Sequence, residues 1–180
     1  QGIIGELTGK ELKILPSRLE SWADFKARAP RGQVLVPTNP GMRAYGANSY
    51  SGYDSLARPF LYGGAMPPGV PPLSRVVSLG DRSQGWSLAL LRQKKEIRLD
   101  GGVVIRWKPG QNSALDTATI ARGKDVGSVT VQRGGRDIAY FIDFAFAFHA
   151  FFPEAKISKR VRHIGKTMDP ARHQTSVFFK

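Results

Sequence analysis

The apolar residues in the first third of the chain follow a helical period before they change to a strand-like run. Over residues 19–29 they recur every three or four positions, which places Trp22 and Phe25 on one face and predicts a helix. Pro30 ends this helix, because proline cannot donate to the backbone hydrogen-bond ladder. Residues 33–36 are rich in β-branched and aliphatic side chains and predict a strand.

The second half of the chain shows mostly the period of two that is typical of strands. Residues 75–79 predict a strand and residues 86–93 a short helix. Two hairpins follow, over 96–107 and 127–142, and each turns at an Asp-Gly or Gly-Gly pair between alternating runs. Residues 143–153 predict a short and very aromatic helix that a proline ends.

A long stretch between these regions, residues 37–73, has neither period and is rich in Gly, Pro and Tyr. Long irregular loops are uncommon in compact domains, and they are often functional. This loop carries an aromatic and polar cluster made of Arg43, Tyr45, Asn48, Tyr50 and Tyr53. Such residues are enriched at protein interfaces and can also stack on bases, but no nucleic-acid-binding motif surrounds them. The alternative is a packed surface loop held in place by its tyrosines.

These elements together predict an α+β fold rich in β-structure. We expect a small sheet built from antiparallel hairpins, a few short helices and the long irregular loop. We also expect an internal duplication. Residues 1–157 are expected to form one compact domain and residues 158–180 a basic, extended tail.

The duplication is visible as a faint repeat. The segments SWADFKARAPRGQVL and FAFAFHAFFPEAKI both consist of a predicted helix, a proline and a strand-like run. The repeat aligns Phe25 with Phe148, Pro30 with Pro153 and Val34 with Ile157. Two copies of one supersecondary unit explain this pattern most economically.

The charge balance favours anionic partners. Among 180 residues there are 27 Lys and Arg against 14 Asp and Glu, a net charge of +13. The first 90 residues contribute +4 and the last 90 contribute +9. Nucleic acid, an anionic membrane surface or an acidic protein would suit this charge, while a solvated basic surface without a dedicated partner is the alternative.

Several classes of site are excluded by what the sequence lacks. There is no cysteine, so disulfides, thiolate metal sites and cysteine nucleophiles are impossible. The segment GELTGKE is one residue too short for a phosphate-binding loop, and Glu11 stands where a Ser or Thr should hold magnesium. The apolar stretch 138–152 is too short for a membrane span and contains Asp143 and His149. We therefore expect no cofactor and no metal.

The remaining candidates for chemistry are few. His149, His163 and His173 are not spaced as metal ligands on a helix face. Asp54 and Asp116, like Asp143, are more often turn or helix caps than acids or bases. The candidate catalytic residues are Asp54 and His149. The candidate binding residues are Arg43, Tyr45, Tyr50, Tyr53, Lys159, Arg160 and Arg162.

Four separated segments carry a resemblance: SWADFKARAP, RAYGANSYSGYDS, RWKPGQNSALDT and FAFHAFFPEAKI. Together they resemble the bacterial domain of unknown function 3179 family, over roughly residues 1–157. The resemblance implies an exported, periplasmic or envelope location and a β-rich, internally duplicated fold. It implies no known activity.

The resemblance also has departures. Members of the family usually have an upstream half with a Cys-Pro-x-Cys segment, of which WKPGQNSAL looks like a degenerate second copy. Lys108 and Gln111 then stand at the cysteine positions, so no metal or redox role is carried over. Members often have an extra stretch where residues 133–137 make a short turn here.

The leading hypothesis is a non-catalytic binding or structural module, an accessory subunit that docks on a larger, membrane-associated assembly of the cell envelope. Its partners would be proteins, with attraction of the basic tail to an anionic lipid surface as a further contribution. The alternatives are an enzyme or small-ligand binder that uses the 40–72 loop as a pocket wall, and a polyanion-binding protein. Nucleic acid is the disfavoured partner, since no recognition motif is present.

Overall fold

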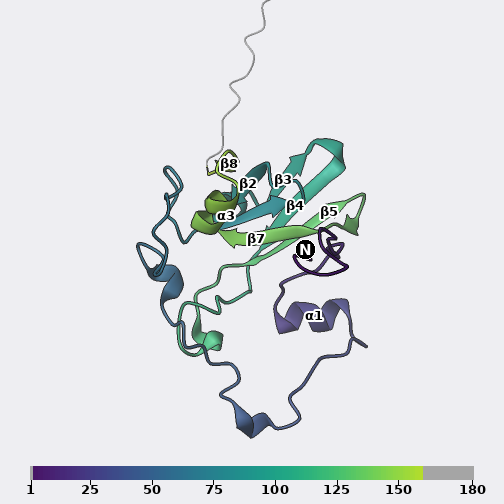
Figure 1. Ribbon diagram of the computed structural model, residues 1–180. Coiled ribbons are helices and arrows are strands. Elements are labelled where there is room, and N and C mark those ends of the chain that lie inside the picture. The colour runs from purple at the N-terminus through teal and green to yellow at the C-terminus, as the bar shows by residue number, and fades with distance from the viewer. Residues whose placement is uncertain (1, 160–180) are drawn as a thin grey trace, which may run out of the picture.

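The computed structural model describes residues 2–159, and its ordered elements are short helices and two small sheets (Figure 1). The α-helices are α1 (Trp22–Arg28), α2 (Leu88–Lys94) and α3 (Ala145–Phe151). Single-turn 3-10 helices are η1 (Pro40–Met42), η2 (Tyr53–Ser55), η3 (Asp100–Gly102) and η4 (Ile120–Arg122). The strands are β1 (Arg75–Leu79), β2 (Gln84–Ser87), β3 (Glu96–Leu99), β4 (Val103–Lys108), β5 (Ser128–Arg133), β6 (Arg136–Asp137), β7 (Tyr140–Phe144) and β8 (Lys156–Ser158).

The strands form two four-stranded sheets. The first has the order β7-β1-β2-β8, in which β1 is antiparallel to both of its neighbours and β8 runs parallel to β2. The second has the order β3-β4-β5-β6 and is antiparallel throughout. The turn of its first hairpin is built on Gly101 and Gly102, whose φ angles of 69° and 72° are unfavourable for residues with a Cβ.

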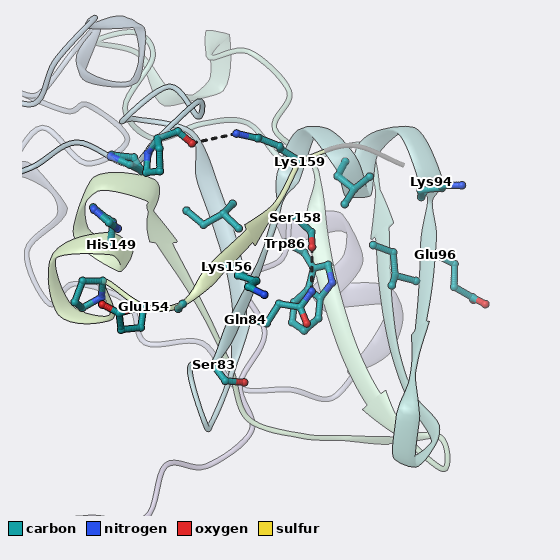
Figure 2. A pocket seen from close by; sticks show the side chains of 17 residues that line it. Ser83, Gln84, Trp86, Lys94, Glu96, His149, Glu154, Lys156, Ser158 and Lys159 are labelled. Atoms are coloured by element: carbon teal, nitrogen blue, oxygen red, sulfur yellow. Dashed lines mark hydrogen bonds between the residues drawn. The ribbon is translucent and has the colours of Figure 1, made fainter. Parts of the chain in front are cut away.

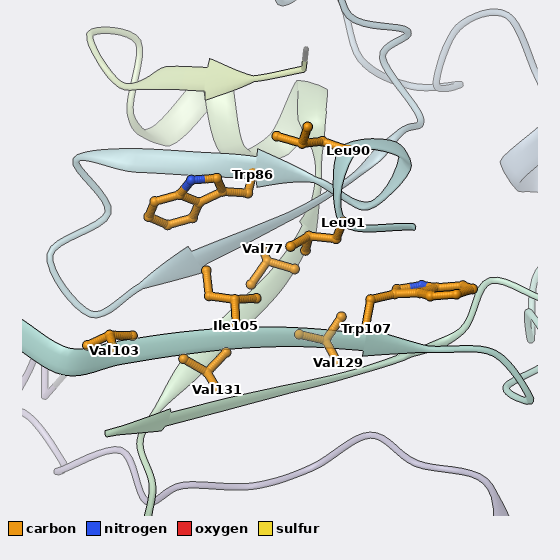
Figure 3. Packing of buried hydrophobic residues seen from close by; sticks show 9 residues of the cluster. All are labelled: Val77, Trp86, Leu90, Leu91, Val103, Ile105, Trp107, Val129 and Val131. Atoms are coloured by element: carbon orange, nitrogen blue, oxygen red, sulfur yellow. The ribbon is translucent and has the colours of Figure 1, made fainter. Parts of the chain in front are cut away.

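Strand β1 is buried on both faces, because successive side chains of a strand point to opposite sides. Val77 faces the second sheet and α2, where Figure 3 shows the larger of two apolar clusters. Val76 faces α3, where it packs with Phe148. The larger cluster consists of Val77, Trp86, Leu90, Leu91, Val103, Ile105, Trp107, Val129 and Val131.

Trp107 is fixed at the end of this cluster by contacts on both sides of its ring. Its indole N–H donates to the carbonyl of Val126 at 3.0 Å, and the Lys95 ammonium lies 4.2 Å from the ring centre. The backbone of Gly127 lies so close to the ring that an added Cβ would be 2.2 Å from it. Because Gly127 has no side chain, its backbone can pack directly against the ring of Trp107.

The α+β prediction is confirmed, and most predicted elements are present. The strand over 75–79 and the turns of both hairpins lie where the pattern places them. The helices predicted over 19–29 and 143–153 are present as the shorter α1 and α3.

Three details of the prediction are wrong. Residues 33–36 form no strand, because no described strand lies beside them. Trp86 belongs to β2, and the helix begins only at Leu88, where the Ser87 hydroxyl accepts the N–H of Leu90 at 3.2 Å. The second hairpin contains only β5 and β6, since β7 crosses to the other sheet and pairs with β1.

No helix within residues 2–159 has both the length and the apolar composition that a bilayer crossing requires. The most apolar stretch of the chain, residues 138–152, contains β7 and α3, which pack on the first sheet.

We expect Gly127→Ala to lower the free energy of unfolding by about 2 kcal/mol, because it adds both overpacking against Trp107 and left-handed strain. Gly135→Ala is the matched control, since Gly135 has a similar φ of 78° but open space around it. Urea unfolding of both variants measures the difference. Equal losses in the two variants would show that the contact with Trp107 contributes nothing.

Candidate functional site

The N-terminal arm, which we define as residues 2–36, exposes most of its apolar side chains. No residue of the arm is buried, and Leu12 and Leu35 are 93% and 99% exposed. Among the described residues, eighteen large hydrophobic side chains are exposed, and eleven of them belong to the arm. Exposed apolar side chains concentrated in one segment favour an interaction site.

The backbone of the arm on either side of α1 takes no part in the sheets or helices of the fold. Residues 11–20 and 33–38 make no backbone–backbone hydrogen bond with any other described residue. Helix α1 itself is well formed, with the Ser21 hydroxyl accepting the N–H of Asp24 at 3.2 Å. The arm thus presents a capped helix between two irregular segments, and the only backbone contact in them, within the described residues, is that of Leu19 with Tyr140.

Polar contacts hold the arm against the rest of the molecule. The guanidinium of Arg18 donates to both carboxylate oxygens of Asp137, at 2.6 and 2.7 Å, and Lys108 pairs with Asp24 at 2.5 Å. The Arg18 hydrogen bonds lower the pKa of Asp137, and those from Lys108 lower the pKa of Asp24. The apolar side chains of the arm therefore stay outside while its charged side chains fix its position.

A second feature is a buried ion cluster at the start of β1. The carboxylate of Asp54, whose side chain is only 1% exposed, accepts from Arg75 at 2.9 Å and from the Ser113 hydroxyl at 2.6 Å. Arg75 also donates to Ser113 at 2.9 Å. The Lys124 ammonium lies 3.9 Å from the carboxylate of Asp54 and 3.3 Å from that of Asp116. The Asp116 carboxylate also accepts a hydrogen bond from the backbone N–H of Lys124.

This cluster joins segments that are far apart in the sequence. Asp54 lies in the 37–73 loop, Arg75 opens β1, and Ser113 lies in the loop after β4. Burial alone would raise the pKa of Asp54, but the hydrogen bonds from Ser113 and Arg75 lower it overall. A carboxylate held ionised and enclosed in this way is a poor general acid or base, and it acts as the anchor of the long loop.

The two candidate catalytic residues, Asp54 and His149, line two different cavities. Asp54 borders a cavity of about 450 Å³, one wall of which is the 37–73 loop, and the cations Arg92 and Lys124 also line it. His149 instead lines a groove of about 1100 Å³ between α3–β8 and α2–β3, shown in Figure 2. Lys159 lies at the rim of the same groove and donates to the carbonyl of Pro68 at 3.0 Å.

The tyrosines of the 37–73 loop differ in how far they are exposed. Tyr53 turns inward, with its ring 5.6 Å from Phe144 and edge-on to it. Tyr45 and Tyr50 are exposed by 57% and 58%, and Arg43 is exposed as well. Tyr50 and Tyr53 nevertheless share one neighbour, because Tyr50 stacks on Phe60 at 6.3 Å and Tyr53 meets the same ring edge-on at 5.1 Å. Arg160 and Arg162 lie outside the described residues.

Sequence reasoning missed Arg75, Ser113 and Lys124. Asp54 and Asp116 were identified as cap candidates, and Asp116 does accept a backbone N–H in its loop. Asp143 instead pairs with Arg82 at 2.7 Å. The described residues contain no group of three or more His, Asp or Glu side chains placed to bind a metal.

The architecture and the exposed arm define a small α+β module without an evident reaction centre in its described part. The chain matches the family described as "Protein of unknown function (DUF3179)" over residues 1–155, and it belongs to that family. No curated protein and no solved structure matches it.

We expect Arg75→Met to lower the free energy of unfolding by about 3 kcal/mol, because it leaves the Asp54 carboxylate buried without its main cation. Arg98→Met is the matched control. Arg98 is 74% exposed and, within residues 2–159, pairs only with Glu96, so its loss should change stability by less than about 0.5 kcal/mol. Urea unfolding of both variants measures the two losses. Equal losses would contradict the role of the Arg75–Asp54 pair as the anchor of the long loop.

The lowered pKa of Asp54 also predicts a dependence on pH. The contribution of the Asp54 carboxylate to stability is fully present above its unfolded-state pKa, about 3.9. This contribution is lost as the pH falls through the lower folded-state pKa. The free energy of unfolding should therefore fall between about pH 5 and pH 3. Asp54→Asn should show a shallower fall in the same titration, and parallel curves for both proteins would refute this role.

Proposed function

We propose that this protein is a non-catalytic binding module, an accessory subunit that docks on a larger, membrane-associated assembly of the bacterial cell envelope through its N-terminal arm. The observation that carries this proposal is the concentration of exposed apolar side chains in the arm, eleven of eighteen within the described residues. Each such side chain would gain about 1.5–3 kcal/mol if a partner buried it fully.

The backbone of the arm favours a protein over a lipid as the partner. Residues 11–20 and 33–38 have no backbone–backbone hydrogen bonds, and hydrocarbon cannot satisfy such groups. A protein surface can, by adding a strand beside an extended segment.

Charge adds a preference for an acidic partner. Lys10, Lys13 and Lys26 form no ion pair with any described residue, and all three are exposed beside the apolar side chains. Cations at the rim of an interface raise the rate of association with a negatively charged protein more than they raise the affinity for it. The envelope setting itself rests on the family resemblance alone.

We expect Leu35→Asp to release the protein from its assembly in a native gel of gently solubilised membranes from the source bacterium. A buried carboxylate without a partner would oppose docking, while stability should be unchanged because Leu35 is 99% exposed. Phe151→Asp is the control, because Phe151 is 79% exposed but lies on α3, outside the arm.

The expected result is that the wild-type chain and Phe151→Asp migrate with the large assembly and Leu35→Asp migrates alone. A wild-type chain that migrates alone would contradict the proposal. So would a Phe151→Asp variant released as completely as Leu35→Asp, since the interface would then not be specific to the arm.

A further inference from the structure

The cavity of about 450 Å³ at Asp54 lies where four parts of the chain meet. The 37–73 loop, the residues that lead into β1, helix α2 and the loop before β5 all contribute to its lining. Small-molecule sites have volumes of this size, and most of them combine an apolar lining with a few polar groups. The apolar part of the lining here includes Leu56, Leu73, Leu88 and Val126.

One oxygen of the Asp54 carboxylate has no partner. Arg75 and Ser113 both donate to Oδ2, and the Lys124 ammonium lies 3.9 Å from the same oxygen. The other oxygen, Oδ1, is buried and accepts no hydrogen bond within the described part of the chain. Since buried polar atoms almost always have a partner, and since Asp54 lines the cavity, we expect a donor from a molecule that is bound there.

The surroundings of Asp54 favour a neutral donor over a cationic one. The negative charge of the carboxylate is already matched by Arg75 at 2.9 Å, and Lys124 adds a second positive charge nearby. Both cations would repel an ammonium group placed beside them. A hydroxyl group can donate to Oδ1 without this cost, so the expected donor is a hydroxyl.

The cavity also contains a cation that has no anionic partner. Its lining has three cationic side chains, of which Arg75 pairs with Asp54 and Lys124 pairs with Asp116. The third, Arg92, is exposed and makes neither an ion pair nor a hydrogen bond with any residue from 2 to 159. A guanidinium can bind a carboxylate through two parallel hydrogen bonds. A single unmatched charge also suits a carboxylate better than a phosphate monoester, whose charge is about −1.5 to −2.

The remaining acidic residue of the lining, Asp125, is held by backbone groups. Its carboxylate accepts the N–H groups of Gly110, Gln111 and Gly127 at 3.0, 3.2 and 2.7 Å. It forms no ion pair with Arg92, so this guanidinium is available to a bound anion.

We propose that this cavity binds a small hydroxy acid, which is a carboxylic acid with a hydroxyl group and a short apolar chain. The carboxylate pairs with Arg92, and the hydroxyl donates to Oδ1 of Asp54. The apolar chain packs on Leu88, which lies one turn before Arg92 on the same face of α2. The ligand would thereby link the long loop to α2. The site is separate from the N-terminal arm, so the inference does not depend on the proposed docking.

Isothermal titration calorimetry of the purified chain tests the proposal with sets of matched probes. The hydroxy acids are 2-hydroxy-4-methylpentanoate and 3-hydroxybutanoate, each as both enantiomers. The matched acids without the hydroxyl are 4-methylpentanoate and butanoate. The matched alcohols without the carboxylate are 4-methylpentane-1,2-diol and butane-1,3-diol.

We expect at least one hydroxy acid to bind, and to bind about tenfold or more tightly than both of its matched probes. Without the hydroxyl, Oδ1 of Asp54 keeps no partner, and without the carboxylate Arg92 keeps none. The absence of binding by every hydroxy acid up to about 10 mM would overturn the proposal. Equal affinities for the hydroxy acid and the acid without the hydroxyl would also overturn it, because water would then satisfy Oδ1.

A substitution on α2 tests the carboxylate contact separately. Arg92→Met keeps an apolar stem but removes the charge, and we expect it to weaken binding of the hydroxy acid about tenfold or more. Lys94→Met is the matched control, because Lys94 is also exposed on α2 but lines the groove at His149 instead. Urea unfolding checks that both variants are folded. Equal affinities of the two variants for the hydroxy acid would show that Arg92 does not bind its carboxylate.

Discussion

The packing of strand β1, which is covered on both faces, is the constraint on which the rest of the structure depends. Val76 and Val77 are adjacent and both completely buried, so the strand needs one apolar layer on each side. The second sheet and α2 supply one layer, and α3 supplies the other. Arg75, at the first position of the same strand, pairs with Asp54 and so ties the long loop to this core.

The N-terminal arm lies outside this two-sided packing. Helix α1 and the segments on either side of it lie outside the two sheets in Figure 1, held by the pairs of Arg18 with Asp137 and of Lys108 with Asp24. A helix that has no sheet to cover leaves its apolar face in water. The exposed apolar side chains of the arm are the feature on which the proposed docking rests.

How much the sequence predicts depends on whether an element is completed locally. The first hairpin was predictable because its turn residues and alternating side chains lie together in the sequence. Residues 33–36 have the same strand character, yet form no strand, because pairing requires a neighbour that the described chain does not supply.

The candidate site was predictable only in part, for a related reason. Asp54 attracted attention through its position among aromatic and small residues. Its partners Arg75 and Ser113 are 21 and 59 residues away, and no local pattern reports a contact at that distance. The alignment of Phe25 with Phe148 was visible in the sequence, but only the structure shows that one is covered and the other is not.

Amide hydrogen exchange of the purified chain and of its native assembly would test the central claim most directly. The account predicts that the amides of residues 11–17 and 33–38 exchange without protection in the purified chain, while those of β1 are protected. In the assembly, both arm segments should become protected. Protection of these segments already in the purified chain, or free exchange in the assembly, would contradict the claim that the arm is the surface that docks on a partner.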